Sequence, residues 1–517
     1  MKKSKILGIE LGSTRIKSVL INENAEVLAS GSYEWENVLT DGLWSYSLDS
    51  VWEGLATSYK ELASSYSKKY GEELTEIDSL GISAMMHGYL AFDEDDRLLV
   101  PFRTWRNTNT EEAANELSEL FSFNVPQRWS VSHYYQAVKS GESHVSSVAF
   151  LTTLSGYVHY RLTGKKVLGM GDASGMFPLH DGNYDEKMLK KLDLRLKEQG
   201  IDKSFESLLP TVLSAGEEAG RLTEEGARLL DPTGKLKAGA LLCPPEGDAG
   251  TGMVATNSVT PRSANVSAGT SAFLMAVLER ELSSYYPEID VVTTPDGAPV
   301  AMVHVNNFTS EINAWTGLFE EVIALSGGSM SRGELFDALY KKSLDGAPGC
   351  GGLVGYNFLA GEPIAGVKNG LPTVARIPGN PLTLGSFMKM QIYSALGSLS
   401  MGMKILDKEN VEIDSVCGHG GFFKCPRVGQ IAMSSALNAP VTVMQNAGEG
   451  GAWGVAILAL YALDNSESLS SFLDSLFASA EKITLEASDA EKQDFRAFLD
   501  LYVKGLPAEK FASDTIL

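Results

Sequence analysis

The chain has 517 residues, of which 44% are hydrophobic and 21% are charged, and it carries 51 glycines and a net charge of -22 at pH 7. This composition is typical of a folded α/β protein and excludes disordered and fibrous classes, while the length favours two domains over one. The negative charge disfavours nucleic acid and anionic membranes as partners, so a phosphate ligand would need local N–H groups, a lysine and a metal ion.

The first half of the chain alternates strand and helix patterns. Residues 5–22, which contain ILGIELGSTRIKSVLIN, predict two apolar strands joined by the turn Gly12-Ser13-Thr14. A further strand, LGISAM, ends at Met86-His87-Gly88, and another apolar strand is expected at 240–252. We expect helices at 48–69, 110–121, 150–164, 186–198 and 223–230. This order predicts an α/β layer overlaid by a helical subdomain, formed by the helices at 110–121 and 150–164, with the first domain ending near Ala255.

The second half opens with a looser copy of the first hairpin. ANVSAGTSAFLMAVLE at 264–279 again predicts strand, turn and strand, and its turn is Gly269-Thr270-Ser271. In each turn a glycine permits close backbone approach, and the hydroxyls can hydrogen-bond an anion. The repeat therefore predicts a duplicated fold whose two halves each present a phosphate-binding hairpin to a common cleft.

The remainder of the second half combines helices with a glycine turn. The turn Gly418-His419-Gly420-Gly421 follows a strand and precedes a helix through Gln430 and a strand at Val441. Helices are expected at 310–326 and 331–342, and residues 381–406 form a long segment with an apolar face. The tail at 466–506 predicts two charged amphipathic helices that form a solvated cover.

Apolar runs and cysteines bear on the cellular location. The apolar stretch 455–463 is about half as long as a bilayer span, and the first residues lead into a strand containing Glu10 rather than a signal-peptide core. We therefore expect a cytoplasmic protein. Four cysteines without C-x-x-C spacing predict free structural thiols: Cys243, Cys350, Cys417 and Cys425.

Two charged residues lie next to the first turn. Glu10 comes at the end of the first strand, where its carboxylate would bind Mg²⁺ through a water molecule if the turn holds a nucleotide phosphate. Lys17 follows the turn glycine by five residues and could reach a terminal phosphate. The alternatives are an acidic residue that ends an edge strand and a solvated lysine.

Asp248 lies among glycines in the segment Glu246-Gly247-Asp248-Ala249-Gly250. A carboxylate within hydrogen-bond reach of a hydroxyl can accept its proton as the oxygen attacks a γ-phosphorus. A capping or turn aspartate is the alternative. His87, at the carboxyl end of a strand, could donate to a sugar oxygen, and Gly420-Gly421 with Lys424 could lie against an adenine ring; both patterns also fit structural roles.

Taken in order, these segments resemble the FGGY carbohydrate kinases, within the sugar kinase, Hsp70 and actin superfamily. The resemblance covers about residues 5–464. The segments that carry it are ILGIELGSTRIKSVLI, GISAMMHG, LTG followed by GDASGMF, EGDAGTG, SAGTSAF, and GHGGFFKCPRVGQIAMSSALNAPV with EGGAWGVAILA.

The resemblance implies an α/β fold of two ribonuclease-H-like (actin-like ATPase) domains, 1–255 and 256–517, with a cleft between them and helical insertions. It implies ATP and Mg²⁺ as cofactors and Asp248 as general base. The residues implied to hold phosphates or nucleoside are Gly12, Ser13, Thr14, Lys17, Gly269, Thr270, Ser271, Gly420, Gly421 and Lys424. The Met-His-Gly triplet is similar to the xylulokinase branch, so Met86 and His87 are implied to contact the sugar, with Phe273 nearby.

Two departures from the family pattern bear on the substrate. The family usually has Asp where this chain has Glu10, a side chain longer by one methylene. Its W-x-D-x-R segment corresponds here to Trp105-Arg106-Asn107-Thr108-Asn109, in which an amide that also donates replaces a carboxylate. Trp105 and Asn107 remain expected sugar contacts, and the identity of the sugar stays open.

Three hypotheses follow. The first is an ATP-dependent kinase that phosphorylates a terminal hydroxyl of a D-xylulose-like ketopentose or a related sugar or polyol such as ribulose, gluconate, erythritol or glycerol. The second is a sugar-sensing protein that kept the fold and lost turnover, and the third is a phosphatase or ATPase of the same superfamily. We expect sugar and ATP as small-molecule partners, no nucleic acid and no membrane, and allow for a homodimer.

Overall fold

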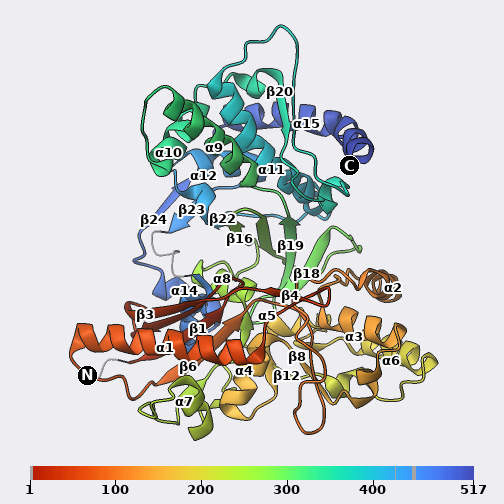
Figure 1. Ribbon diagram of the computed structural model, residues 1–517, viewed down its shortest axis with the longest axis vertical. Coiled ribbons are helices and arrows are strands. Elements are labelled where there is room, and N and C mark those ends of the chain that lie inside the picture. Colours follow the sequence, from red (N-terminus) through yellow and green to blue (C-terminus); the bar gives the residue numbers. More distant parts are fainter. Residues whose placement is uncertain (1–3, 426, 445–449) are drawn as a thin grey trace.

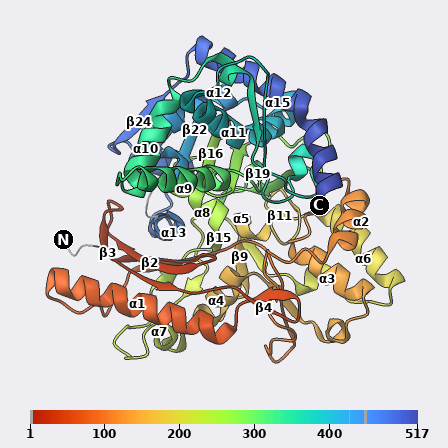
Figure 2. The same ribbon diagram turned by 45° about the horizontal axis from the view of Figure 1, so that its top comes forward.

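The computed structural model describes residues 4–425, 427–444 and 450–517. The N-terminal half of the chain forms the lower part of Figure 1 and most of the C-terminal half forms the upper part. Each part contains one seven-stranded mixed sheet. The turned view in Figure 2 shows helices packed around both sheets.

The first sheet has the strand order β13-β14-β6-β1-β2-β3, and β15 also pairs with β6. Strands β1, β2 and β3 are antiparallel neighbours, whereas β6 runs parallel to β1 and β14 runs parallel to β6. The bounds are β1 Ile6–Leu11, β2 Arg15–Ile21, β3 Val27–Glu34, β6 Ser79–Ala84, β13 Gly220–Arg221, β14 Leu241–Leu242 and β15 Glu246–Gly247.

The second sheet has the order β18-β19-β17-β16-β22-β23-β24. Strand β17 is antiparallel to β16 and β19, while β22 runs parallel to β16 and β23 runs parallel to β22. The bounds are β16 Ser263–Ala268, β17 Ala272–Val277, β18 Ile289–Thr293, β19 Pro299–Val305, β22 Ser415–His419, β23 Val441–Met444 and β24 Lys482–Leu485.

The two sheets therefore repeat one pattern, β3-β2-β1-β6-β14 in the first and β19-β17-β16-β22-β23 in the second, and the predicted duplication is confirmed. The hairpins differ in one detail. Leu11 pairs with Ile16 across a four-residue turn, and Ala268 pairs with Ala272 across a three-residue turn. The two turns therefore differ in length by one residue.

Helices α1 and α13 cover opposite faces of the first sheet. A Cβ at Gly31 of β3 would lie 2.2 Å from the carbonyl oxygen of Ser58 in α1, and a Cβ at Gly8 of β1 would lie 2.0 Å from the carbonyl oxygen of Ala452 in α13. Glycine at these positions is what lets the helices approach so closely. Helix α13 thus packs on the first sheet although it belongs to the C-terminal part of the chain, and the division near Ala255 remains a proposal.

The helices begin at residues that suit helix starts. Ser47 accepts the N–H of Ser50 at the start of α1, and Ser331 and Glu334 form a capping box at α10. The helices of the first half are α1 Leu48–Tyr70, α2 Glu111–Phe121, α3 Ser130–Lys139, α4 Leu154–Thr163, α5 Met170–Ala173, α6 Glu186–Glu198, α7 Glu224–Leu230 and α8 Asp248–Ala255. Those of the second half are α9 Ser310–Leu325, α10 Arg332–Ser343, α11 Leu384–Lys408, α12 Val428–Leu437, α13 Gly450–Tyr461, α14 Leu469–Leu476 and α15 Asp489–Ile516.

Short elements connect the main layers. The two-stranded sheets are β4 Val38–Thr40 with β5 Leu43–Ser45, β7 Leu90–Phe92 with β8 Phe150–Thr152, β9 Val167–Gly169 with β12 Thr211–Leu213, β10 Leu179–His180 with β11 Asn183–Tyr184, and β20 Leu353–Tyr356 with β21 Thr373–Arg376. The 3₁₀ turns are η1 Ser143–Ser147, η2 Phe205–Leu208, η3 Pro348–Gly352, η4 Pro363–Ala365 and η5 Gly421–Phe423.

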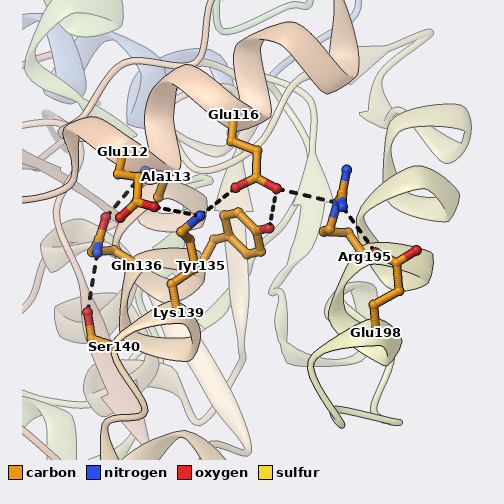
Figure 3. Close-up of polar contacts among 9 residues, drawn as sticks. All are labelled: Glu112, Ala113, Glu116, Tyr135, Gln136, Lys139, Ser140, Arg195 and Glu198. Carbon is orange, nitrogen blue, oxygen red and sulfur yellow. Dashed lines mark hydrogen bonds and ion pairs between the residues drawn. The ribbon is translucent and has the colours of Figure 1, made fainter.

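Helices α2, α3 and α6 form a helical subdomain that charged contacts join (Figure 3). Of the two helices predicted to overlay the sheet, 110–121 is α2 of this subdomain, whereas 150–164 yields α4, whose Leu154 and Val158 pack in the core of the first sheet. Glu116 of α2 accepts hydrogen bonds from Tyr135 at 2.7 Å and Lys139 at 2.6 Å in α3. Its carboxylate also lies 3.4 Å from Arg195 Nε in α6. One carboxylate therefore joins three helices and fixes the loop between α2 and α3, which reaches the candidate site.

Three predicted elements were wrong in extent or kind. The apolar segment 240–252 is not one strand, because β14 and β15 are short and α8 begins at Asp248. The segment 150–164 starts with β8, and Thr153 caps α4 only after it. The tail is not a solvated cover: it adds β24 to the second sheet, and α15 buries Phe495 and Phe498 in the core because its apolar face meets α11.

The buried core is continuous between the two parts. One cluster packs α13 and the helical subdomain against residues of the second sheet such as Met275 and Met302. All four cysteines are buried and free, as predicted. Among the helices in the described part of the chain, none is long and apolar enough to cross a membrane.

Candidate functional site

The first turn is anchored by two aromatic side chains. Trp35 Nε1 donates to the carbonyl oxygen of Gly12 at 2.7 Å, and Tyr46 donates to that of Ser13 at 2.5 Å. The rings of Trp35 and Tyr46 stack with their centroids 4.2 Å apart. Thr14 at the tip is exposed. The turn is therefore rigid at its base and offers its tip to solvent.

The second turn is anchored in the same way by the segment that follows β19. Thr309 Oγ1 donates to the carbonyl oxygen of Gly269 at 2.6 Å, and the N–H of Phe308 donates to that of Thr270 at 2.9 Å. Thr270 is exposed and Ser271 is half-buried. The carbonyl oxygens of Gly269 and Thr270 are therefore both occupied. The hydroxyl groups of Thr270 and Ser271 are the groups of the turn that could bind an anion.

Glu10 and Lys17 are register partners on β1 and β2, so their side chains share the face of the sheet that α13 covers. The N–H of Ala452 donates to Glu10 Oε2 at 3.2 Å. A Cβ at Gly451 would lie 2.5 Å from Glu10 Oε1, so glycine is needed there. Burial raises the pKa of Glu10 to about 7, the Asp248 charge adds to the rise, and Lys17 opposes it.

Asp248 is the first residue of α8, within the segment 240–252 for which the sequence predicts a strand. Its Oδ1 accepts the N–H of Met86 at 3.2 Å and of Ala249 at 3.0 Å. The side chain is open to solvent although protein surrounds it on most sides. Burial raises its pKa, and these N–H groups and the Arg128 charge oppose the rise. It is an accessible carboxylate in a confined setting, as a general base requires.

Met86 and His87 follow β6, and Met86 contacts Asp248 through its N–H. Met86 is buried, and a Cβ at Gly247 would lie 2.1 Å from its Cγ. His87 has a φ of 68°, which a non-glycine residue seldom adopts and which is common at functional sites. Its Nδ1 lies 3.2 Å from the carbonyl oxygen of Gly175. Burial holds the pKa of His87 well below its usual value, so the ring is neutral and Nδ1 is the protonated nitrogen.

The glycine turn after β22 lies beside the second hairpin. Gly420 has a φ of 104°, and a Cβ there would lie 2.4 Å from the carbonyl oxygen of Ala268. Gly421 has open space around its Cα, and Lys424 is exposed. Gln430 is structural, because its amide donates to the carbonyls of Val441 and Ile483. Pro426 and Glu449, which belong to the expected nucleoside segments, lie outside the described residues.

The structure uses Asn107 differently from the expected sugar contact. Its Oδ1 accepts the N–H of Trp44 at 2.8 Å, and its Nδ2 donates to the carbonyl oxygens of Trp44 at 2.9 Å and Thr104 at 3.0 Å. The amide is thus engaged by the β4–β5 hairpin. Trp105 is 38% exposed and Asn109 is exposed. These contacts support a structural role for Asn107.

Two residues of the site went unnoticed in the sequence. Arg128, from the loop between α2 and α3, forms an ion pair with Asp290 of β18, and its charge affects the pKa of Asp248 and of His87. His304 of β19 faces Phe273 of β17 edge-on, with ring centroids 6.5 Å apart. Burial lowers the pKa of His304 to about 4. Neither residue lies in a motif; only the sheet pairing and the helical subdomain place them near His87.

The carboxylates of the site fit a magnesium ion held mainly by its substrate. Within the described ranges, no three His, Cys, Asp or Glu side chains group into a metal site. Glu10 and Asp248 nevertheless repel each other, which a cation between them would relieve. Mg²⁺ commonly takes one or two carboxylates together with phosphate oxygens and water, so the donor set is compatible with it.

Comparison with known proteins identifies a family with a similar sequence. The family model for the N-terminal domain of the FGGY family of carbohydrate kinases matches residues 5–233, and that for the C-terminal domain matches residues 264–463. Xylulose kinase of Klebsiella pneumoniae is 26% identical over 293 residues, 54% of this chain and 55% of the relative. That match spans about half of the relative's length. Xylulose kinase of Haemophilus influenzae is 21% identical over 479 residues, 89% of this chain and 91% of the relative.

Solved structures agree with the fold. The crystal structure of ligand-bound xylulose kinase from Lactobacillus acidophilus superimposes with a TM-score of 0.80 at 16% identity, covering 99% of this chain and 100% of the other. The expected α/β fold is therefore confirmed. Since the two family models together match well over half of the sequence, the chain belongs to the FGGY family of carbohydrate kinases.

Proposed function

We propose that the protein transfers the γ-phosphate of ATP to a terminal hydroxyl of a ketopentose or a related sugar or polyol. The observation that carries this proposal is a hydrogen bond between the proposed sugar contact and the proposed base, in which the N–H of Met86 donates to Asp248 Oδ1. Both N–H donors go to Oδ1, so Oδ2 is the oxygen available to a substrate hydroxyl. Asp248 would accept the hydroxyl proton as the oxygen attacks phosphorus.

His87 would bind the sugar as a hydrogen-bond acceptor. A carbonyl oxygen only accepts, so the contact with Gly175 requires a proton on Nδ1 and leaves Nε2 with a lone pair. A sugar hydroxyl can donate to that nitrogen. The sequence predicts that His87 donates to a sugar oxygen, whereas here His87 would accept a hydrogen bond. Such a contact would direct the hydrogen of the sugar hydroxyl toward Nε2. Met86, Arg128 and Phe273 would complete the wall of the sugar site.

The two hairpins would hold the phosphates. Hydroxyls at Thr14 and Thr270 are exposed at the tips, and Lys17 lies on the same sheet face as Glu10. Gly421, with open space around it, would face the nucleoside together with Lys424. Bound Mg²⁺ would supply charge neutralisation on the phosphates, with Glu10 holding it through water. Gly12, Ser13, Gly269 and Ser271 would contribute backbone or hydroxyl groups.

Movement between the domains would complete the site. We place a hinge near 255–261, between α8 and β16. Polar contacts tie β18 to the first half of the chain, since Asn124 donates to Asp290 at 2.7 Å and the N–H of Thr293 donates to Ser174 Oγ at 3.1 Å. Closure would bring both turns onto one ATP and exclude water. A cytoplasmic location and a homodimer remain predictions.

A substrate panel tests this function. ATP consumption is followed in a coupled assay with ketoses, aldonates and polyols, with and without Mg²⁺. Sugar-dependent turnover supports the kinase. Silence throughout would favour a sugar sensor, and turnover without sugar would favour a hydrolase.

A further inference from the structure

A buried carboxylate lies in β15, the strand that leads into Asp248. Glu246 precedes Asp248 by two residues, and its side chain is 1% exposed. The N–H of Gly171 donates to Oε1 at 3.2 Å, and the N–H of Asp172 donates to Oε2 at 3.0 Å. Both N–H groups lie in the first turn of α5, where a helix leaves its donors without internal partners. Glu246 therefore joins β15 to α5.

Glycines leave the space that this carboxylate fills. A Cβ at Gly169 would lie 2.2 Å from Oε1, and a Cβ at Gly171 would lie 2.5 Å from Oε2. A Cβ at Gly250 would lie 3.3 Å from Oε2. The side chain at 246 and the glycines at 169 and 171 thus form one packed unit, in which a larger residue at either glycine would expel the carboxylate.

The segment that Glu246 holds reaches two other parts of the site. The carbonyl oxygen of Gly175 accepts the Nδ1 proton of His87 at 3.2 Å. Ser174 Oγ accepts the N–H of Thr293, on β18 of the second half, at 3.1 Å. Asp172 Oδ2 accepts the hydroxyl of Thr153 at 2.6 Å. Residues 171–175 therefore contact Glu246 of β15, the imidazole of His87, and Thr293 of the second sheet.

We propose that Glu246 is a positioning residue that fixes His87 relative to Asp248. On one side β15 leads directly into Asp248 and packs Gly247 against Met86. On the other side the tether holds the carbonyl that sets the orientation and tautomer of His87. Without it, the segment 171–175 loses its only carboxylate contact to β15 among the described residues, and the imidazole shifts. The inference rests on the proposed function, because it assigns His87 to the sugar.

The test compares Glu246→Ala, Glu246→Gln and the matched control Asp231→Asn in the full chain. Asp231 is also buried, 7% exposed, and also accepts backbone N–H groups, from Lys235 at 3.0 Å and Leu236 at 2.9 Å, but it lies at the end of α7. We expect Glu246→Ala to raise the sugar KM about tenfold and leave the ATP KM within about threefold. Glu246→Gln, which keeps one acceptor oxygen, should fall between, and Asp231→Asn should change neither KM.

Two measurements without substrate accompany the kinetics. Hydrogen exchange should show faster exchange over 169–177 in Glu246→Ala and not in the control. The NMR signals of the His87 ring nitrogens should move, because Nδ1 loses its fixed partner. A sugar KM equal to wild type in folded Glu246→Ala, or unchanged exchange over 169–177, would overturn the proposal. If Glu246→Ala does not fold, Glu246→Gln is judged by the same criteria.

The proposed function can fail separately. If the wild-type protein phosphorylates no member of the panel, the proposed function is wrong, and the exchange and NMR data alone decide the tether. Altered exchange together with a moved His87 signal would then still support positioning by Glu246. Unchanged signals would overturn it.

Discussion

The N–H of Met86 donates to Asp248 Oδ1 at 3.2 Å, although 162 residues separate the two in the sequence. Met86 is in the turn that ends β6, and Asp248 begins α8 after β15, which pairs in parallel with β6. The two strand ends therefore bring Met86, the proposed sugar contact, and Asp248, the proposed base, to one point. Because this contact occupies Oδ1, it leaves Oδ2 as the oxygen that would face the proposed substrate.

Asp248→Asn should abolish most sugar phosphorylation while ATP still binds. The amide oxygen can accept the N–H groups of Met86 and Ala249, but the side chain cannot take up the hydroxyl proton. Removal of a general base commonly lowers kcat by about 10²- to 10⁴-fold. Steady-state kinetics and ATP titration by calorimetry would check this, with Asp231→Asn as control. Activity within about threefold of wild type would remove Asp248 from its role.

His87→Ala should raise the KM for the sugar about fivefold, because one hydrogen bond to a neutral hydroxyl is lost. The KM for ATP should change less than about twofold. His180→Ala is the control, since that histidine is exposed on β10 and pairs with Glu281. A rise in the KM for ATP alone would contradict the assignment of His87 to the sugar and would place it at the nucleotide instead.

Glu10→Gln should weaken the apparent affinity for Mg²⁺. The amide removes the charge that would hold the ion through water, so half-saturation should require about tenfold more Mg²⁺ at fixed ATP. Glu10→Asp keeps the charge and restores the residue usual in the family, so it should lie close to wild type. The measurement is activity against free Mg²⁺. Identical curves for Glu10→Gln and wild type would exclude Glu10 from the metal site.

Stability should fall as pH rises through neutrality, partly because of Asp172. Burial raises the pKa of Asp172 to about 7, above its ordinary value, so the folded state holds this proton more tightly than the unfolded state. The stability it contributes is complete below pH about 4 and is lost as pH rises through about 7.

Asp172→Asn cannot titrate, so its melting temperature should fall less than that of wild type between pH 5 and 7.5. When the free energy of unfolding is plotted against pH, the slopes of wild type and Asp172→Asn should differ by about 1 kcal/mol per pH unit. In Asp231→Asn the slope in this range should match wild type, because backbone and hydroxyl donors lower the pKa of Asp231. Parallel curves for Asp172→Asn and wild type would contradict the assignment.

The sequence predicts the repeated hairpins well because their signal is local. Strand, Gly-hydroxyl turn and strand lie within a few residues, and both turns form where expected. The prediction for the tail was wrong because the burial of α15 depends on a distant contact. Helix α15 is charged on one face, and its contact with Tyr393 of α11 shows that Phe498 is a core residue. Local pattern does not reveal which face meets a distant helix.

The site divides in the same way. Asp248, Met86 and His87 lie in short motifs at strand ends, and the structure brings them together. Arg128 and His304 lie in no motif, because their place depends on how the helical subdomain and β18–β19 meet β6. Asn107 departs from the carboxylate of the family pattern and bonds to Trp44, a contact that depends on the β4–β5 hairpin.

The most direct test of the account is the product of the reaction. Purified protein is incubated with ATP, Mg²⁺ and each member of a panel of ketoses, aldonates and polyols, and the products are identified by ³¹P NMR. The account predicts one ADP for each sugar phosphate, with the phosphate on a terminal hydroxyl, and loss of that product in Asp248→Asn. ADP and inorganic phosphate formed without sugar, or a sugar phosphate still formed at the wild-type rate by Asp248→Asn, would contradict it.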